Sequence, residues 1–125
     1  MEESREIIRK LKRLEKKRSG LMEVLLGNEE MALGTLRRAK RPCGNPRCGK
    51  CADGPSHEQV VLYHTTADGK RTSRFVRRSE EARFEQAAVA YRRFREAIKE
   101  LKHLDSEEIE LIGALKQSRS IMREG

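Results

Sequence analysis

Apolar residues recur every three or four positions near the start of the chain. The positions are Ile7, Leu11, Leu14, Leu21 and Leu25, with Arg18 as the one polar interruption. This spacing places the apolar side chains on one face of a helix, in the pattern of a coiled-coil seam. It predicts a helix from Ser4 to Leu26, with Ser4 as its N-cap and Gly27-Asn28 in the left-handed conformation that ends many helices.

The same spacing returns after Ser79 and predicts a second, longer helical region. Its apolar positions are Phe84, Ala87, Tyr91, Phe94, Ile98 and Leu101. Ser79 is expected to cap this helix. Asp105-Ser106-Glu107-Glu108 resembles a capping box, so a new helix can begin there, or the first can continue through Ile109, Ile112 and Leu115. A single helix from Ser79 to Met122 would be about 66 Å long and would leave part of its stripe for self-association or a protein partner.

The middle of the chain is expected to form strands. Glycines and prolines between Gly34 and His57 exclude a continuous helix. Two β-prone runs, Val60–Thr66 and Arg71–Val76, flank an Asp-Gly pair and predict a β-hairpin. Leu36–Arg41 is a candidate third strand. An isolated hairpin is marginal in water, so this one needs another element or a metal.

The fold class that follows is mainly α with a small β insert. We expect an antiparallel helical hairpin of coiled-coil type, capped by a β-hairpin that carries a zinc knuckle. Residues 1–125 are expected to form a single domain, with an N-terminal helix in 1–30, a basic, Cys-rich β insert in 31–78 and a long helical region in 79–125. The first stripe should pair with Tyr91, Phe94, Ile98 and Leu101.

Composition narrows the class of protein. Charged residues make up 38% of the chain against 36% apolar residues, a balance that suits amphipathic helices better than a thick core. No apolar run reaches the length of a membrane span, and the first residues do not resemble a signal peptide. Three cysteines are an odd number for a disulfide framework. A reducing, cytoplasmic location is therefore expected.

The net charge of +8 is concentrated in the middle of the chain, where residues 31–78 hold eleven Lys and Arg against three Asp and Glu. The basic residues are Arg37, Arg38, Lys40, Arg41, Arg47, Lys50, Lys70, Arg71, Arg74, Arg77 and Arg78. Arginine outnumbers lysine eight to three, which favours bidentate contact with phosphates. On the second strand of the hairpin, alternation places Arg71, Ser73, Phe75 and Arg77 on one face and Thr72, Arg74 and Val76 on the other.

Three cysteines and a histidine in the middle segment have the spacing of a zinc site. The candidate ligands are Cys43, Cys48, Cys51 and His57, with His64 as an alternative fourth ligand. Glycines and a proline between the cysteines suit the tight turn of a Cys3His knuckle, although three reduced, unliganded cysteines remain the alternative. A closed four-ligand site leaves no position for a catalytic water, and no catalytic triad, His-Glu-x-x-His or phosphate loop is present. We therefore expect a protein that is not an enzyme.

Several motifs occur together in one order. They are Gly34-Thr35-Leu36, Cys43-Gly44-Asn45-Pro46-Arg47-Cys48 with Cys51, His57, Asp68-Gly69-Lys70-Arg71-Thr72-Ser73-Arg74 and Tyr91-Arg92-Arg93-Phe94-Arg95. Over about Met31 to Leu104 the chain thereby resembles a family of small, uncharacterised prokaryotic proteins often encoded near transposases. The resemblance implies an association with mobile elements. The aromatic strand of that family is replaced here by Val61-Leu62.

These observations predict a small basic protein that binds DNA or RNA. We expect an accessory or regulatory factor linked to a mobile element, with a zinc-stabilised tip that contacts phosphates. Few aromatic residues lie near the tip, so base stacking is not expected. The alternative is a coiled-coil adaptor between proteins, in which the zinc site is structural. No membrane partner is expected.

Overall fold

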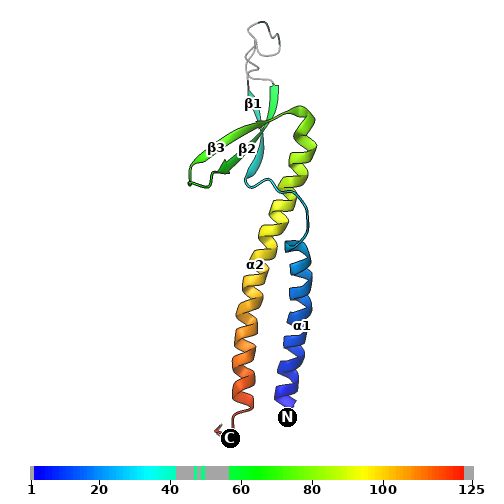
Figure 1. Cartoon of the computed structure of the whole chain (residues 1–125), viewed down its shortest axis with the longest axis vertical. Helices are drawn as coiled ribbons and strands as arrows, with labels where there is room; N and C mark the ends of the chain where they lie inside the picture. The colour runs from blue at the N-terminus through cyan, green and yellow to red at the C-terminus, as the bar shows by residue number, and fades with distance from the viewer. Residues whose placement is uncertain (1, 42–46, 48, 50–56, 123–125) are drawn as a thin grey trace. The chain divides into compact units, whose positions relative to one another are not determined.

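The computed structural model describes residues 2–41, 47, 49 and 57–122. In chain order they form the elements α1 (Glu2–Leu25), β1 (Thr35–Arg41), β2 (His57–Thr65), β3 (Arg71–Val76), the 3-10 turn η2 (Arg78–Glu80) and α2 (Glu81–Ser118) (Figure 1). The prediction of a mainly helical protein with a small β insert is confirmed. Two compact units share α2: residues 1–28 with 93–125, and residues 29–92. Within the described residues, neither helix has an apolar stretch long enough to cross a membrane.

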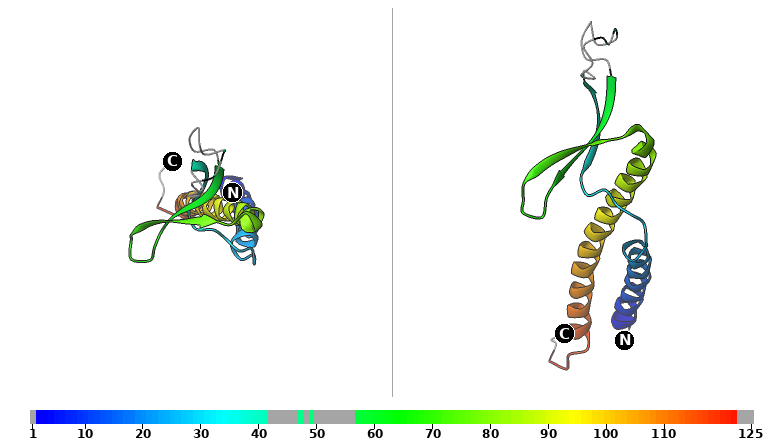
Figure 2. Two further views of the ribbon diagram at one scale, coloured as in Figure 1. Left: turned by 90° about the horizontal axis from the view of Figure 1, so that it is seen from above. Right: turned by 45° about the horizontal axis from the view of Figure 1, so that its top comes forward.

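The first unit is an antiparallel pair of helices, α1 and the C-terminal part of α2 (Figure 2). Its buried positions are Ser4, Ile7 and Leu14 in α1 and Ala97, Leu104 and Ser118 in α2. Within each helix, successive buried positions are separated by three, seven or fourteen residues, as expected for a heptad seam. The hydroxyl oxygens of Ser4 and Ser118 lie 2.8 Å apart, which fixes the alignment of the two helices.

The seam on α2 differs from the predicted one. Phe94, Ile98 and Leu101 are half-buried, and the predicted Tyr91 belongs to the other unit. The helix continues through Ile109 and Ile112, one of the two alternatives that the sequence left open, but these residues are 70% and 51% exposed and do not belong to the buried stripe. The reason is the heptad spacing itself. Counted on from Ala97, it reaches Leu101, Leu104, Glu108, Leu111, Leu115 and Ser118 and leaves both isoleucines beside the seam.

The polar interruption at Arg18 has partners on α2. Its guanidinium donates hydrogen bonds to Asp105 and, at 3.3 Å, to Glu108. The hydrogen bond to Asp105 is the main cause that raises the pKa of Arg18. α2 runs unbroken through this stretch, and the Ser106 hydroxyl donates to the Lys102 carbonyl within the helix. The residues of the capping-box pattern therefore bind across the seam or within α2 and do not start a new helix.

Three predicted helix ends are wrong. Ser4 lies inside α1, which begins at Glu2, and its hydroxyl faces Ser118 and does not cap the helix. Ser79 lies in η2, and α2 begins at Glu81. Gly27 has no left-handed backbone, because among the described residues only Gly69 has a positive φ, 87°. At the end of α1 the Gly27 amide instead donates to the Val24 carbonyl at 3.4 Å.

The second unit contains a three-stranded antiparallel sheet with β2 in the centre (Figure 1). Gly69, with its positive φ, forms part of the turn between β2 and β3, as the Asp-Gly pair predicts. The candidate strand Leu36–Arg41 is confirmed within β1, and β2 begins at His57, earlier than predicted. The buried core of this second unit consists of Ala32, Val60, Leu62, Val76 and Ala87, with Leu36 and Phe84 packed against it. β1 and α2 thus supply the support that an isolated hairpin lacks.

Residues between α1 and β1 tie the sheet to the start of α2. The Ala32 amide donates to the Ala87 carbonyl at 3.0 Å. Arg83 donates two hydrogen bonds of 2.7 and 2.9 Å to the Glu30 carboxylate, which lower the pKa of Glu30. Gly34 follows, and a Cβ on it would lie 2.3 Å from the Tyr63 carbonyl oxygen. The connection therefore passes β2 too closely for any side chain.

We predict opposite effects for the same substitution at two glycines. Gly34→Ala is expected to lower the free energy of unfolding by about 1–3 kcal/mol, because the Tyr63 carbonyl is backbone and cannot move aside. Gly20→Ala is expected to raise it by about 0.5–1 kcal/mol, because Gly20 lies inside α1 with nothing within 4 Å of a new Cβ. Urea unfolding measures both. A Gly34→Ala protein as stable as the parent would contradict the close approach.

Candidate nucleic-acid interface

Strand pairing assigns the sheet residues to two faces. Side chains alternate along a strand, and residues directly opposite each other on neighbouring strands share a face. Val60 lies opposite Arg38 and Val76, and it belongs to the same core as Ala87 of α2. We call this side the helix face and the other the open face. The described open-face residues are Thr35, Arg37, Ala39, Gln59, Val61, Tyr63, Thr65, Arg71, Ser73 and Phe75.

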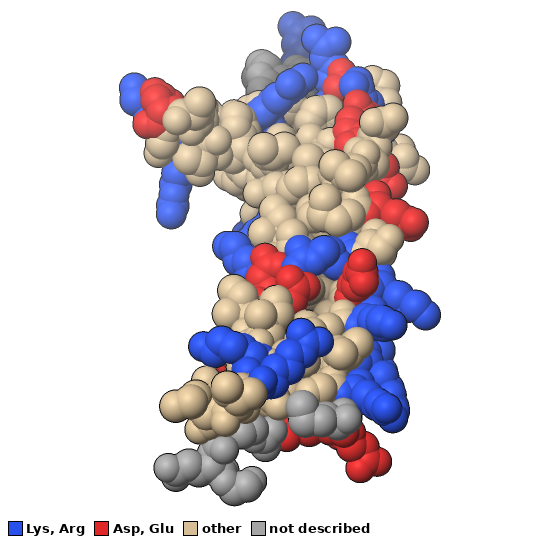
Figure 3. All heavy atoms as spheres, turned by 60° about the horizontal axis from the view of Figure 1, so that its bottom comes forward, with Lys and Arg blue, Asp and Glu red and all other residues tan. Residues whose placement is uncertain are grey.

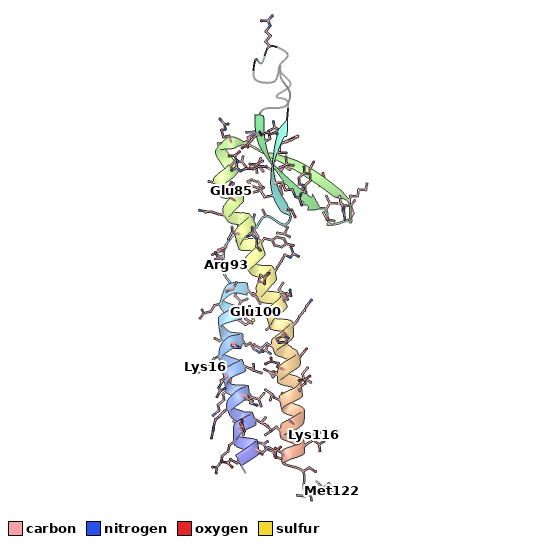
Figure 4. All side chains as sticks on the ribbon, turned by 180° about the vertical axis from the view of Figure 1, so that it is seen from behind. Lys16, Glu85, Arg93, Glu100, Lys116 and Met122 are labelled. Atoms are coloured by element: carbon pink, nitrogen blue, oxygen red, sulfur yellow. The ribbon has the colours of Figure 1, made fainter. Side chains whose placement is uncertain are left out.

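The basic residues of the helix face have neighbours that engage them. Arg38 donates to Glu85 at 2.7 Å and lies 4.0 Å from Glu81, both on the first turns of α2 (Figure 4 labels Glu85). The Arg74 guanidinium lies 5.4 Å from the centre of the Phe84 ring, a cation–π distance. Lys40 is opposite Glu58 in the sheet. Positive charge on this face is thus largely balanced or used in packing.

Positive charge on the open face is not balanced. Arg37 on β1 and Arg71 on β3 are exposed, and among the described residues neither forms an ion pair. No described open-face residue is acidic. Lysine and arginine side chains with acidic neighbours are poor phosphate ligands, whereas these two arginines keep their bidentate donors available.

Two aromatic side chains accompany these arginines. Phe75 on β3 is 57% exposed and Tyr63 on β2 is 38% exposed. Beside both rings, Val61 is only 1% exposed although it lies on the same face, between Arg37 and Phe75. Alternation along β2 and β3 brings both rings to one side of the sheet, an arrangement that the small number of aromatic residues did not suggest.

The other predicted basic residues lie in turns, at the ends of strands or outside the described residues. Lys70 is exposed in the turn between β2 and β3. In the same turn, the Thr66 hydroxyl donates a hydrogen bond to the Asp68 carboxylate, which lowers the pKa of Asp68. Arg47, Arg77 and Arg78 are also exposed. Arg41 ends β1, and nothing is described of its side chain, while Lys50 lies outside the described residues.

The helices carry charges of both signs. On the surface that Figure 3 shows, Lys and Arg side chains lie beside Asp and Glu side chains. Residues 1–30 hold eight basic and seven acidic residues, and residues 79–125 hold nine and ten. Such balanced surfaces are typical of solvated helices, so the helices add little net attraction for a polyanion.

The candidate zinc ligands fall mostly outside the described residues. Cys43, Cys48 and Cys51 are not among them, and His57 is described only as the first residue of β2. In the described part of the chain, no group of three His, Cys, Asp or Glu residues could hold a metal ion. His57 is the pairing partner of Arg41, so the two residues that flank segment 42–56 lie side by side. His64 lies seven residues further along β2, roughly 23 Å away at 3.3 Å per residue.

Sequence reasoning missed the residues that distinguish the two faces. Alternation from Phe75 was visible in the sequence, but Tyr63 joins it only through the register that pairs Tyr63 with Ser73. Nothing in the sequence linked Glu81 or Glu85 to Arg38. The pairing of a basic residue of the sheet with acidic residues of α2 could not have been found before the two faces of the sheet were known.

Comparison with known proteins gives a family and no relative of known function. No curated protein and no solved structure matches the chain. One family model, described as "Domain of unknown function (DUF6788)", matches residues 4–86, from the first turn of α1 through the sheet to the start of α2. Because the match covers more than half of the 125 residues, the chain belongs to this family.

Proposed function

We propose that this protein binds nucleic acid and that the open face of the sheet contacts phosphates. The observation that carries the proposal is the difference between the two faces of the sheet. Arg38 and Arg74 on the helix face are engaged by Glu85 and Phe84, whereas Arg37 and Arg71 have no acidic neighbour among the described residues of the open face. A surface with unbalanced arginines attracts phosphates over a Debye length and binds them bidentately.

A zinc site belongs to the same proposal. Cys43, Cys48, Cys51 and His57 would hold the metal as a closed structural site in the segment that joins β1 to β2. The pairing of Arg41 with His57 supports this, because Arg41 precedes Cys43 by two residues in the sequence and His57 is itself a candidate ligand. The resemblance to proteins encoded near transposases adds the cellular role that we propose, an accessory or regulatory factor of a mobile element.

The experiment is a salt series with two matched double variants. Log affinity for duplex DNA should fall linearly with log salt, with a slope near 0.9 per phosphate neutralised. Arg37→Gln with Arg71→Gln should reduce the slope by about two. Arg38→Gln with Arg74→Gln removes the same number of charges but should leave the slope nearly unchanged, because these side chains are already engaged on the helix face.

Two outcomes would contradict the proposal. Equal losses in the two double variants would mean that net charge matters and that the open face does not. An affinity that does not change with salt would remove phosphate contact altogether. The adaptor would then be the better function, with exposed Ile109 and Ile112 on α2 as the first contact residues to test.

A further inference from the structure

The open face places its aromatic and basic side chains in neighbouring rows. One row across the three strands consists of Arg37, Val61 and Phe75, and the next of Thr35, Tyr63 and Ser73. Phe75 and Tyr63 are therefore diagonal neighbours on adjacent strands, with Cα atoms about 7–8 Å apart. Arg71, opposite Thr65, is in turn diagonal to Tyr63. Tyr63 therefore lies on the diagonal between Arg37 and Arg71, and Phe75 lies beside this diagonal, in the row of Arg37 with Val61 between them.

This arrangement has the parts of a base-stacking platform. Proteins that bind single strands combine cationic side chains along the backbone with aromatic side chains on which successive bases stack. Here the side chains of Phe75 and Tyr63 are 57% and 38% exposed, and the apolar residue Val61 beside them is only 1% exposed. Exposed rings on a polar protein surface lose hydration when a base covers them, so stacking is favourable.

We infer that the open face binds single-stranded nucleic acid by stacking neighbouring bases on Phe75 and Tyr63, while Arg37 and Arg71 contact the flanking phosphates. This inference rests on the proposed function and narrows its ligand from any nucleic acid to single strands. It also implies tolerance of sequence, because every base has a π face.

Charge and shape disfavour other occupants of this face. A second copy of the chain, docked face to face, would bring two pairs of arginines together without a described acidic residue to balance them. A duplex keeps its bases stacked inside the helix, so its surface offers phosphates to Arg37 and Arg71 but no base to Phe75 or Tyr63. Single strands should therefore bind more tightly than duplexes of equal length.

The test measures binding of fluorescent oligothymidine, oligouridine and a duplex of the same length. Phe75→Leu and Tyr63→Leu keep apolar volume but remove the rings, and each should weaken single-strand binding roughly 5- to 150-fold. Duplex affinity should change little. Leu33→Ala is the matched control, since Leu33 is 60% exposed but lies outside the open face, and it should bind all three probes like the parent. Phe75→Tyr should restore binding. The thymidine and uridine probes distinguish DNA from RNA as the source of the strand.

A spectroscopic measurement reports the stacking directly. The chain has two tyrosines and no tryptophan, so Tyr91→Phe leaves Tyr63 as its only strong fluorophore. Oligothymidine should quench this fluorescence at saturation, and a duplex should not. A merely structural role of Tyr63 would leave the emission unchanged on binding.

The outcomes separate this inference from the proposed function. If the Phe75→Leu and Tyr63→Leu proteins bind single strands like the parent while the Arg37→Gln, Arg71→Gln protein loses affinity, stacking is refuted and phosphate binding stands. If the parent binds single strands and duplexes equally and Tyr63 is not quenched, stacking is likewise refuted. If the parent binds none of the probes, both fail.

Discussion

Leu14→Ala is expected to lower the free energy of unfolding of the helix pair by about 2–5 kcal/mol. Leu14 is 7% exposed in the seam of α1, and its replacement loses buried apolar surface and leaves a cavity between the helices. The hydroxyls of Ser4 and Ser118 and the pairs of Arg18 with Asp105 and Glu108 hold the alignment of the helices on either side of it, so a simple shift along the axis cannot fill the space. Denaturant unfolding followed by circular dichroism at a helix wavelength measures the loss.

Leu26→Ala is the matched control for this prediction. It makes the same chemical change directly after α1, where Leu26 is 74% exposed, and should change stability by no more than about 0.5 kcal/mol. Similar small effects at both leucines would show that α1 does not bury its stripe and would overturn the antiparallel pair. Equal large losses would show that Leu26 is covered in solution by a partner.

Protein purified without added metal is expected to contain one zinc per chain, and loss of a ligand should weaken zinc binding by more than about 100-fold. Removing a residue that only orients a ligand already lowers metal affinity 10- to 100-fold, and removing a thiolate ligand should lower it further. Structural zinc in small domains contributes about 10–16 kcal/mol of apparent binding free energy, so Cys48→Ser should have the largest effect of any substitution in the 31–78 segment. Elemental analysis and competition with a chelator give stoichiometry and affinity.

The two histidines provide the control for the zinc prediction. His57→Ala should lose zinc affinity, and His64→Ala should not, because β2 separates His64 from the strand end at His57 by seven residues. Cobalt substitution adds a second readout, since thiolate ligands give an intense charge-transfer band. A protein that binds neither zinc nor cobalt would leave the three cysteines as unliganded thiols. If His64→Ala loses zinc and His57→Ala does not, the fourth ligand is His64, near the other end of β2.

Much of the fold follows from periodicity and turn chemistry in the sequence. Three-and-four spacing located both helices to within a few residues, because burial of one stripe is what stabilises a helix of this composition. Asp68-Gly69 located the turn of the hairpin, because glycine alone accepts the φ of 87° found there without strain. The concentration of arginine in residues 31–78 is likewise a property of the sequence alone.

Only part of the candidate site could be predicted from the sequence. All the arginines of the sheet were identified, and alternation placed Arg71 and Arg74 on opposite faces, but the sequence did not show which face α2 covers. Neighbouring residues of a strand point to opposite sides, so one of each pair had to face α2. Which one faces it depends on the register of β1, β2 and β3 and on where Ala87 and Phe84 pack.

The sequence by itself thus determined the elements, the turn and the total charge of the middle segment, since each depends on interactions between residues close along the chain. Only the tertiary structure decided that Glu85 neutralises Arg38, that Arg18 meets Asp105 and that Tyr63 lies beside Phe75 on the open face. Each of these relations joins residues distant in sequence. Their partners are selected by packing and strand register, which are properties of the whole fold and leave no local pattern in the chain.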